Sequence, residues 1–260
     1  IHPRHWRRGL PTTPSESTPV ALVTGAGSGI GREVARQLSD LGFACVLCGR
    51  RVPPLEETAS LLRGPALLLS VDLSKPRDVE RMVDQAFDWR GRLDVLVNNA
   101  GWSPAATISQ TDAKMIEQVF ALNAMAPALT IARAWPRLTQ QAAAAHNSGR
   151  PMPRVTIVNV SSMAVKDPFA QLYAYAAAKA STHLLARSAA NEGQTLNIKA
   201  FAVAPGAVET ELLRTIVTRD MLPEAMTLAP AQVAAVIVDC IRGEHDAQNG
   251  EPIWVPSPTP

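Results

Sequence analysis

Residues Val20 to Gly31 read V-A-L-V-T-G-A-G-S-G-I-G, and this stretch decides the fold. Its first four residues are apolar, which is typical of a strand that is buried on both faces. Glycines at positions 25, 27, 29 and 31 form a turn, and a helical pattern follows from about Ile30 to Leu41. A buried strand, a glycine-rich turn and a helix in succession predict the first unit of a parallel α/β sheet.

The same alternation continues to the end of the chain. Further strands are expected at about 44–48, 66–71, 93–97, 155–160, 198–203 and 253–255. Helices are expected at about 53–62, 76–89, 112–138, 172–190 and 231–241. This order predicts a single doubly wound Rossmann domain, with a parallel sheet of about seven strands and helices on both faces. Ligands of such sheets bind beyond the carboxyl ends of the strands.

We expect this domain to occupy residues 19–255, between a flexible leader at 1–18 and a flexible tail at 256–260. The leader has no apolar stretch, so it does not resemble a secretory signal. A piece of another targeting sequence is the alternative interpretation. The alternating prolines of the tail cannot sustain a helix or a strand ladder.

Composition excludes several classes of function. The chain has 25 basic and 23 acidic residues and a net charge of +2, which gives no electrostatic case for nucleic acid or an anionic membrane. No apolar run approaches the roughly 20 residues of a membrane span. Of the three cysteines, Cys45 and Cys48 lie in a predicted strand at a spacing that sends their side chains to opposite faces. We therefore expect buried thiols in a reducing, cytoplasmic compartment, and no metal site.

The glycine turn is a candidate phosphate site. Glycine lets the backbone approach a pyrophosphate closely, and the positive end of the following helix favours its charge. No Lys-Ser/Thr pair closes the turn, so a P-loop is not indicated. A purely structural glycine-rich turn is the alternative.

Tyr175 and Lys179 are the candidate reacting groups. A spacing of four residues places both side chains on one face of a helix. An unperturbed tyrosine has a pKa of about 10, and a nearby ammonium group is expected to lower it towards neutrality. Tyr173 is the weaker candidate because Ala177, four residues later, carries no charge.

These segments together resemble the short-chain dehydrogenase/reductase (SDR) family, and most of all its 3-oxoacyl-carrier-protein reductases. The resemblance spans about Val20 to Thr210 and is carried by six elements in order. They are T-G-x-x-x-G-x-G at 24–31, the Asp at 72, N-N-A-G at 98–101, the Asn at 123, the Ser at 162 with Y-x-x-x-K at 175–179, and P-G-x-V-x-T at 205–210.

The resemblance implies a role for each matching residue. The catalytic set would be Asn123, Ser162, Tyr175 and Lys179, with Tyr175 as general acid/base. Ser162 would bond the substrate oxygen, and Asn123 would position a water, although an Asn satisfied by the backbone is the alternative. The cofactor contacts would come from Thr24, Gly25, Ser28, Gly29, Ile30, Gly31, Arg50, Asp72, Leu73, Asn99, Ala100, Gly101, Tyr175, Lys179, Pro205, Gly206, Val208 and Thr210. Asp72 could equally be a helix cap.

The end of the second expected strand predicts NADP(H) over NAD(H), with NAD(H) as the alternative. NAD-specific relatives carry an acidic residue there, whereas this chain has Gly49 followed by Arg50 and Arg51. A guanidinium can pair with the 2′-phosphate. Both arginines being merely solvated, opposite Glu56 or Glu57, is the alternative.

The predicted activity is hydride transfer between a nicotinamide cofactor and a carbonyl or secondary alcohol, with an apolar or acyl-linked ketone as substrate. The apolar stretch 212–228 should cover that substrate, with Trp102, Met163 and Phe169 as further candidates for the lining. The alanine-rich helices at 112–138 and 172–190 match the subunit contact of the family, so we expect a homotetramer or homodimer. The alternatives are a catalytically silent SDR-like sensor, which usually lacks the Tyr or the Lys, and a methyltransferase, which has no use for them.

Overall fold

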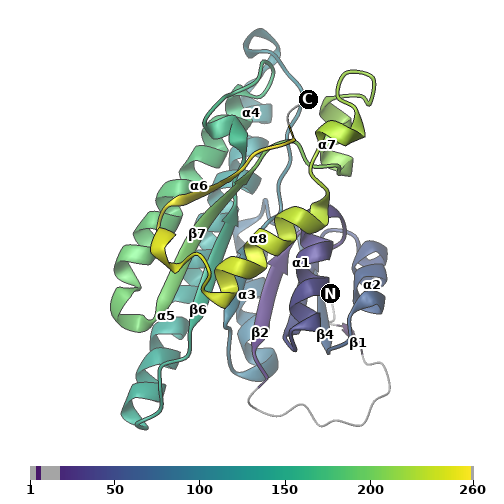
Figure 1. Cartoon of the computed structure of the whole chain (residues 1–260). Helices are drawn as coiled ribbons and strands as arrows, with labels where there is room; N and C mark the ends of the chain where they lie inside the picture. Colours follow the sequence, from purple (N-terminus) through teal and green to yellow (C-terminus); the bar gives the residue numbers. More distant parts are fainter. Residues whose placement is uncertain (1–3, 7–17, 259–260) are drawn as a thin grey trace.

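The computed structural model describes residues 4–6 and 18–258 (Figure 1). The strands are β1 (Arg4–Trp6), β2 (Val20–Thr24), β3 (Ala44–Gly49), β4 (Ala66–Ser70), β5 (Val95–Asn98), β6 (Val155–Val160), β7 (Ile198–Pro205) and β8 (Pro252–Val255). The α-helices are α1 (Gly29–Asp40), α2 (Val52–Leu61), α3 (Pro76–Arg90), α4 (Ala113–Phe120), α5 (Ala126–Asn147), α6 (Tyr173–Glu192), α7 (Glu211–Ile216) and α8 (Pro230–Arg242). Every strand and helix expected from the sequence is present.

The strands form one sheet in the order β1-β4-β3-β2-β5-β6-β7-β8. The seven strands β2 to β8 are parallel, as predicted. The order reverses between β2 and β5, which is the point where ligands of doubly wound sheets bind. The eighth strand, β1, falls within the segment expected to be a flexible leader, and it pairs antiparallel with β4.

Helices cover both faces of the sheet and divide the core into two layers (Figure 1). One layer holds side chains of α1, α2 and α8, and the other holds side chains of α3, α5 and α6. Strands β2, β5 and β6 are buried along their whole length, as is typical of strands covered on both faces.

The long helix expected at 112–138 is longer than predicted. It runs from Ala113 to Asn147 and is interrupted by a π-helical turn at Ala121–Met125. The alanines at 142–145 extend it because alanine has the highest helix propensity. By length and composition this helix could also cross a membrane. The sequence did not predict this, because polar residues interrupt its apolar run. In the domain it packs against α3 and α6.

The carboxyl end of the chain is ordered further than the sequence suggested. Residues 256–258 belong to the described structure, whereas 259–260 lie outside it. The Ser257 hydroxyl accepts a hydrogen bond from the Ala207 N–H at 2.8 Å, so the start of the expected flexible tail lies on the loop after β7.

Candidate active site

The glycine turn lies at the carboxyl end of β2, at the reversal point of the sheet. Gly25 has a φ of +66°, and a Cβ there would lie 2.8 Å from Asn99 Nδ2. At Gly31 a Cβ would lie 2.3 Å from the Gly25 carbonyl oxygen. The turn thus forms a cradle that only glycine permits, which fits the close approach of a dinucleotide.

Thr24 and Asn99 fix this turn to the end of β5. The Thr24 hydroxyl accepts hydrogen bonds from the backbone N–H of Asn99 at 2.9 Å and of Ala100 at 3.1 Å. In return, Asn99 Nδ2 donates to the Thr24 carbonyl at 2.8 Å. The N-N-A-G element therefore holds the turn as well as ending the strand.

Two residues that were not predicted to belong to the site hold the outer side of the turn. Arg32 donates to the Gly27 carbonyl at 2.6 Å, and the Thr58 hydroxyl donates to the Ala26 carbonyl at 2.9 Å. In a planar trans peptide the N–H points away from the C=O. The N–H groups in the same peptides as the Ala26 and Gly27 carbonyls therefore point away from Thr58 and Arg32. No side-chain hydrogen bond caps α1 at Ser28, which leaves the first N–H groups of this helix available to an anion.

Tyr175, Lys179 and Ser162 converge at the ends of α6 and β6. Lys179 is almost fully buried, and its ammonium donates to the Val160 carbonyl at 2.7 Å. The same ammonium lies 5.8 Å from the centre of the Tyr175 ring. Ser162 hydrogen-bonds with Tyr175 and accepts from the Ala164 N–H at 3.1 Å. The structure brings these three predicted residues together.

The expectation that Lys179 lowers the tyrosine pKa is wrong for this structure. Burial raises the pKa of Tyr175 to about 12, and the hydrogen bond with Ser162 opposes this rise only in part. Burial also lowers the pKa of Lys179 to about 8. The lysine is directed at a backbone carbonyl, so desolvation outweighs its effect on the phenol.

Asn123 lies in the π-helical turn and is completely buried. Its Nδ2 donates to the carbonyls of Trp102 at 2.7 Å and Val119 at 2.9 Å, and its Oδ1 accepts from the Trp102 N–H at 3.3 Å. These bonds match the alternative interpretation, in which backbone groups satisfy the amide of Asn123. A Cβ at Gly101 would lie 2.8 Å from Asn123 Oδ1 and 3.3 Å from Lys179 Nζ, so Gly101 lets both side chains approach the same point.

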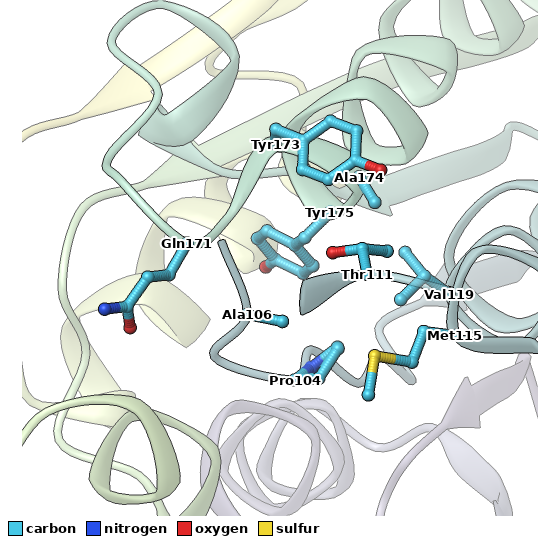
Figure 2. A pocket seen from close by; sticks show the side chains of 9 residues that line it. All are labelled: Pro104, Ala106, Thr111, Met115, Val119, Gln171, Tyr173, Ala174 and Tyr175. Atoms are coloured by element: carbon cyan, nitrogen blue, oxygen red, sulfur yellow. The ribbon is translucent and has the colours of Figure 1, made fainter. Parts of the chain in front are cut away.

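A small cavity opens beside Tyr175, between α4, the start of α6 and the loop after β5 (Figure 2). It is lined by Pro104, Ala106, Thr111, Met115, Val119, Gln171, Tyr173, Ala174 and Tyr175. The lining is mainly apolar and includes two phenols, those of Tyr173 and Tyr175. None of the residues expected to line the substrate pocket belongs to this set, and Phe169 and Met221 are largely exposed.

The loop after β7 carries the P-G-x-V-x-T element and is held firmly. Gly206 donates to the Val255 carbonyl at 2.9 Å, and a Cβ there would lie 2.4 Å from Ser257 Oγ. Thr210 caps α7 by accepting from the Leu213 N–H, and its methyl group would lie 3.0 Å from a Cβ on Gly29. The P-G-x-V-x-T loop, which is expected to contact the cofactor, and the glycine turn are therefore neighbours.

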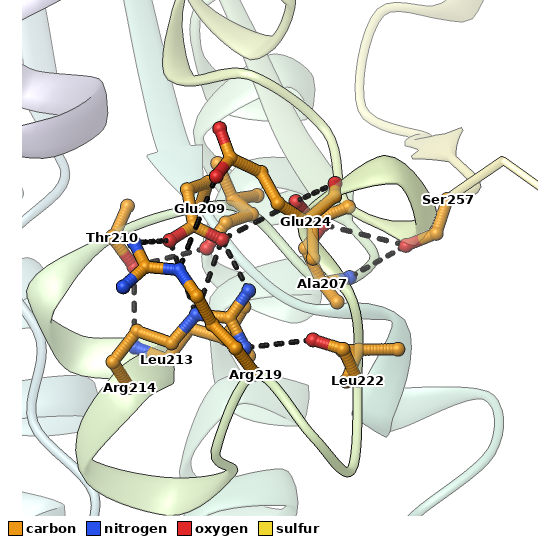
Figure 3. A network of polar contacts seen from close by, with 11 residues as sticks. Ala207, Glu209, Thr210, Leu213, Arg214, Arg219, Leu222, Glu224 and Ser257 are labelled. Atoms are coloured by element: carbon orange, nitrogen blue, oxygen red, sulfur yellow. Dashed lines mark hydrogen bonds and ion pairs between the residues drawn. The ribbon is translucent and has the colours of Figure 1, made fainter.

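The segment after this loop is locked by an ion-pair network (Figure 3). The Glu209 carboxylate pairs with Arg214 and, at 2.8 Å, with Arg219, and Arg214 also donates to the Leu222 carbonyl at 2.8 Å. Arg214, and to a smaller extent Arg219, lowers the pKa of Glu209. The stretch 212–228, which was expected to cover the substrate, is thereby fastened to the end of the P-G-x-V-x-T loop.

The cofactor contacts expected after β3 and β4 differ in their surroundings. Arg50 is exposed, and within residues 18–258 its side chain has no ion-pair partner, whereas Arg51 pairs with Glu211 at 3.7 Å. Glu57 pairs with Arg32 instead. The Asp72 carboxylate accepts hydrogen bonds from the N–H and the hydroxyl of Ser74, so it closes a local turn.

Leu73, another expected cofactor contact, belongs to the core. Its side chain is therefore not available to a ligand. Ile30 is also packed against the core. Among the described residues, no cluster of His, Cys, Asp and Glu could hold a metal ion.

A glycine cradle at the reversal point, with Tyr, Lys and Ser at the neighbouring strand ends, defines a Rossmann-fold NAD(P)-dependent oxidoreductase. Comparison with known proteins narrows this class. The chain belongs to the short-chain dehydrogenase/reductase family, since the family model for short chain dehydrogenase matches residues 19–220.

Similar proteins include reductases of oxoacyl substrates. The chain is 33% identical over 249 residues to a Streptomyces violaceoruber protein described as ketoacyl reductase 2 of the granaticin polyketide synthase, covering 90% of this chain and 93% of the relative. It is 31% identical to the rhamnolipids biosynthesis 3-oxoacyl-[acyl-carrier-protein] reductase of Pseudomonas aeruginosa, covering 79% of each chain. A 3-ketoacyl-(acyl-carrier-protein) reductase from Brucella melitensis, solved with NADH, superposes with a TM-score of 0.82 at 27% identity, covering 93% and 98% of the two chains.

Proposed function

We propose that this protein is an NADPH-preferring carbonyl reductase of 3-oxoacyl-type substrates, with Tyr175 as general acid. The observation that carries the proposal is the convergence of Ser162, Tyr175 and Lys179 beside an apolar cavity. The relatives named as ketoacyl and 3-oxoacyl reductases support the substrate class.

The bound cofactor would supply the hydride, and the residues of the chain manage the proton. Tyr175, which burial keeps protonated, donates a proton to the developing alkoxide. Ser162 donates a hydrogen bond to the same oxygen. Lys179 holds its charge beneath the site through the Val160 carbonyl. The glycine turn and the uncapped start of α1 would bind the pyrophosphate.

The test is Tyr175→Phe in an assay of NADPH oxidation with a panel of 3-oxoacyl thioesters and simple ketones. Removal of the proton donor should lower the rate by about 10²–10⁴-fold. NADPH binding, measured by fluorescence titration, should be nearly unchanged. Tyr173→Phe is the matched control, because Tyr173 shares the cavity without a lysine four residues later. Full turnover by Tyr175→Phe would refute the catalytic assignment.

Cytoplasmic location is part of the same proposal. Three buried thiols, Cys45, Cys48 and Cys240, are consistent with a reducing compartment. Fractionation of the native host's cells would test it.

A further inference from the structure

His183 follows Lys179 by four residues on α6. Tyr175, Lys179 and His183 therefore share one face of this helix. The His183 Nε2 lies 2.7 Å from the hydroxyl of Ser161, which is almost completely buried at the end of β6. Ser161 directly precedes Ser162, so this bond joins the strand end that carries one reacting group to the helix that carries the other two.

The bond can form with either tautomer of the imidazole, since the Ser161 hydroxyl both donates and accepts. With the hydrogen on Nε2, His183 donates to Ser161, and the single Ser161 proton is directed at the Lys179 carbonyl at 3.3 Å. The Ser161 N–H donates to the Val203 carbonyl of β7 at 2.7 Å. Ser161 is thus held to α6 by its side chain and to the sheet by its backbone.

The far side of the imidazole is also fixed. Its ring meets the Trp254 ring of β8 at 5.3 Å in an edge-to-face arrangement, and Lys166 lies 5.8 Å from the same indole. Burial, and next the charge of Arg187, lowers the pKa of His183, which favours the neutral ring. With the bond on one side and the indole on the other, the imidazole has little freedom to turn.

We propose that His183 is a positioning residue, which through Ser161 holds Ser162 at its place beside Tyr175 and Lys179. The inference rests on the proposed function, since it gives Ser162 and Tyr175 their catalytic roles. Ser162 follows in extended conformation, with φ −160° and ψ 149°, so any shift of Ser161 moves its hydroxyl. A misplacement of about 1 Å in a reacting group can lower a rate by about 100-fold.

The test compares His183→Leu and Ser161→Ala with the double variant. Each single variant should lower kcat by about tenfold or more while KM and the NADPH dissociation constant stay within about twofold. Because both remove the same bond, the double variant should lose little more than either single one. His183→Gln, whose amide can donate in place of Nε2, should restore most of kcat. Ser188→Ala is the matched control, a serine exposed on the same helix.

The outcomes separate this inference from the proposed function. If Tyr175→Phe abolishes turnover but the Ser161 and His183 variants keep the kcat of the unchanged protein, the positioning role is refuted and the catalytic assignment stands. If Tyr175→Phe keeps full turnover, the proposed function itself fails. Multiplicative losses in the double variant, or failure of His183→Gln to restore kcat when thermal unfolding shows a folded protein, also refute the positioning role. Ser161→Ala keeps the test valid if His183→Leu does not fold, because it removes a single oxygen.

Discussion

At the scale of single residues, burial decides the chemistry more than neighbouring charge does. Tyr175 and Lys179 share a helix face, yet desolvation raises the pKa of the phenol to about 12 and lowers that of the ammonium to about 8. Both shifts favour the neutral form. The site therefore holds a proton on Tyr175 at neutral pH, which suits reduction, where the phenol must donate.

This protonation state predicts opposite behaviour in the two reaction directions. Oxidation of the alcohol needs the phenolate as proton acceptor, and its population grows as pH rises towards the raised pKa of Tyr175. Reduction needs the phenol, which predominates below that pKa. We expect kcat/KM for oxidation to rise between about pH 7 and 9, while kcat/KM for reduction does not. Thermal unfolding at each pH is the control, and an oxidation rate that is flat or falls would contradict the prediction.

Arg50 carries the prediction of cofactor choice. It directly follows β3, whose end lies next to the glycine turn, since the Ala26 N–H donates to the Cys48 carbonyl at 3.1 Å. Its side chain is exposed. Arg50→Ala should raise KM for NADPH strongly and KM for NADH little, because only NADPH offers a 2′-phosphate for the guanidinium. Arg51→Ala is the control, as Arg51 already pairs with Glu211. Equal effects of Arg50→Ala on both cofactors would contradict it.

At the scale of elements, the first turn is built by contacts from three directions. Asn99 comes from the end of β5, Thr58 from α2 and Arg32 from α1, and all three bond carbonyls between Thr24 and Gly27. The glycines inside this ring have no room for a side chain. The turn is thus held in one conformation by the elements around it, rather than by its own sequence alone.

Gly31→Ala tests this account. The added Cβ would meet backbone and the Asn99 amide at 2.3–2.5 Å, although Gly31 does not have a positive φ. We expect a lower melting temperature and at least a tenfold weaker binding of NADPH, measured by calorimetry. Gly42→Ala is the control, with a φ of +89° and nothing within 4 Å of the new Cβ. It should cost about 1–2 kcal/mol of stability without weakening binding. Equal binding by both variants would show that the turn can relax.

At the scale of the whole molecule, the helices from α4 to α6 expose large apolar side chains. Ile116 on α4, Met125 in the π-helical turn and Leu184 on α6 are exposed by 37%, 51% and 64%. Alanines surround them, and small side chains let helices approach closely. Ile116 and Met125 also belong to the helix Ala113–Asn147, which is long and apolar enough to cross a membrane by length and composition.

We predict that these helices form the contact of a homotetramer or homodimer with isologous interfaces. Light scattering at micromolar concentration should give a mass two or four times that of the 27.8 kDa chain. Leu184→Glu should shift the mass towards the monomer. Leu61→Glu, at a residue 51% exposed on the opposite face of the sheet, should not. A monomeric unchanged protein would contradict the prediction.

The sequence by itself determined the order of the elements and the places of Tyr175, Lys179 and Ser162, because each depends on a short period or a local motif. The buried strands are continuous apolar runs, and Y-x-x-x-K needs only one helical turn. The end of the long helix was misplaced, since the expected end at Leu138 left out the alanines that carry the helix to Asn147. Only the tertiary structure decided the features that depend on burial and on contacts between residues far apart in the chain. The bond between Ser161 and His183 joins residues 22 apart, and the Glu209 network joins the loop after β7 to residues up to Arg219. The pKa values of Tyr175 and Lys179 likewise follow from how completely the fold removes water from them, which no spacing in the chain encodes.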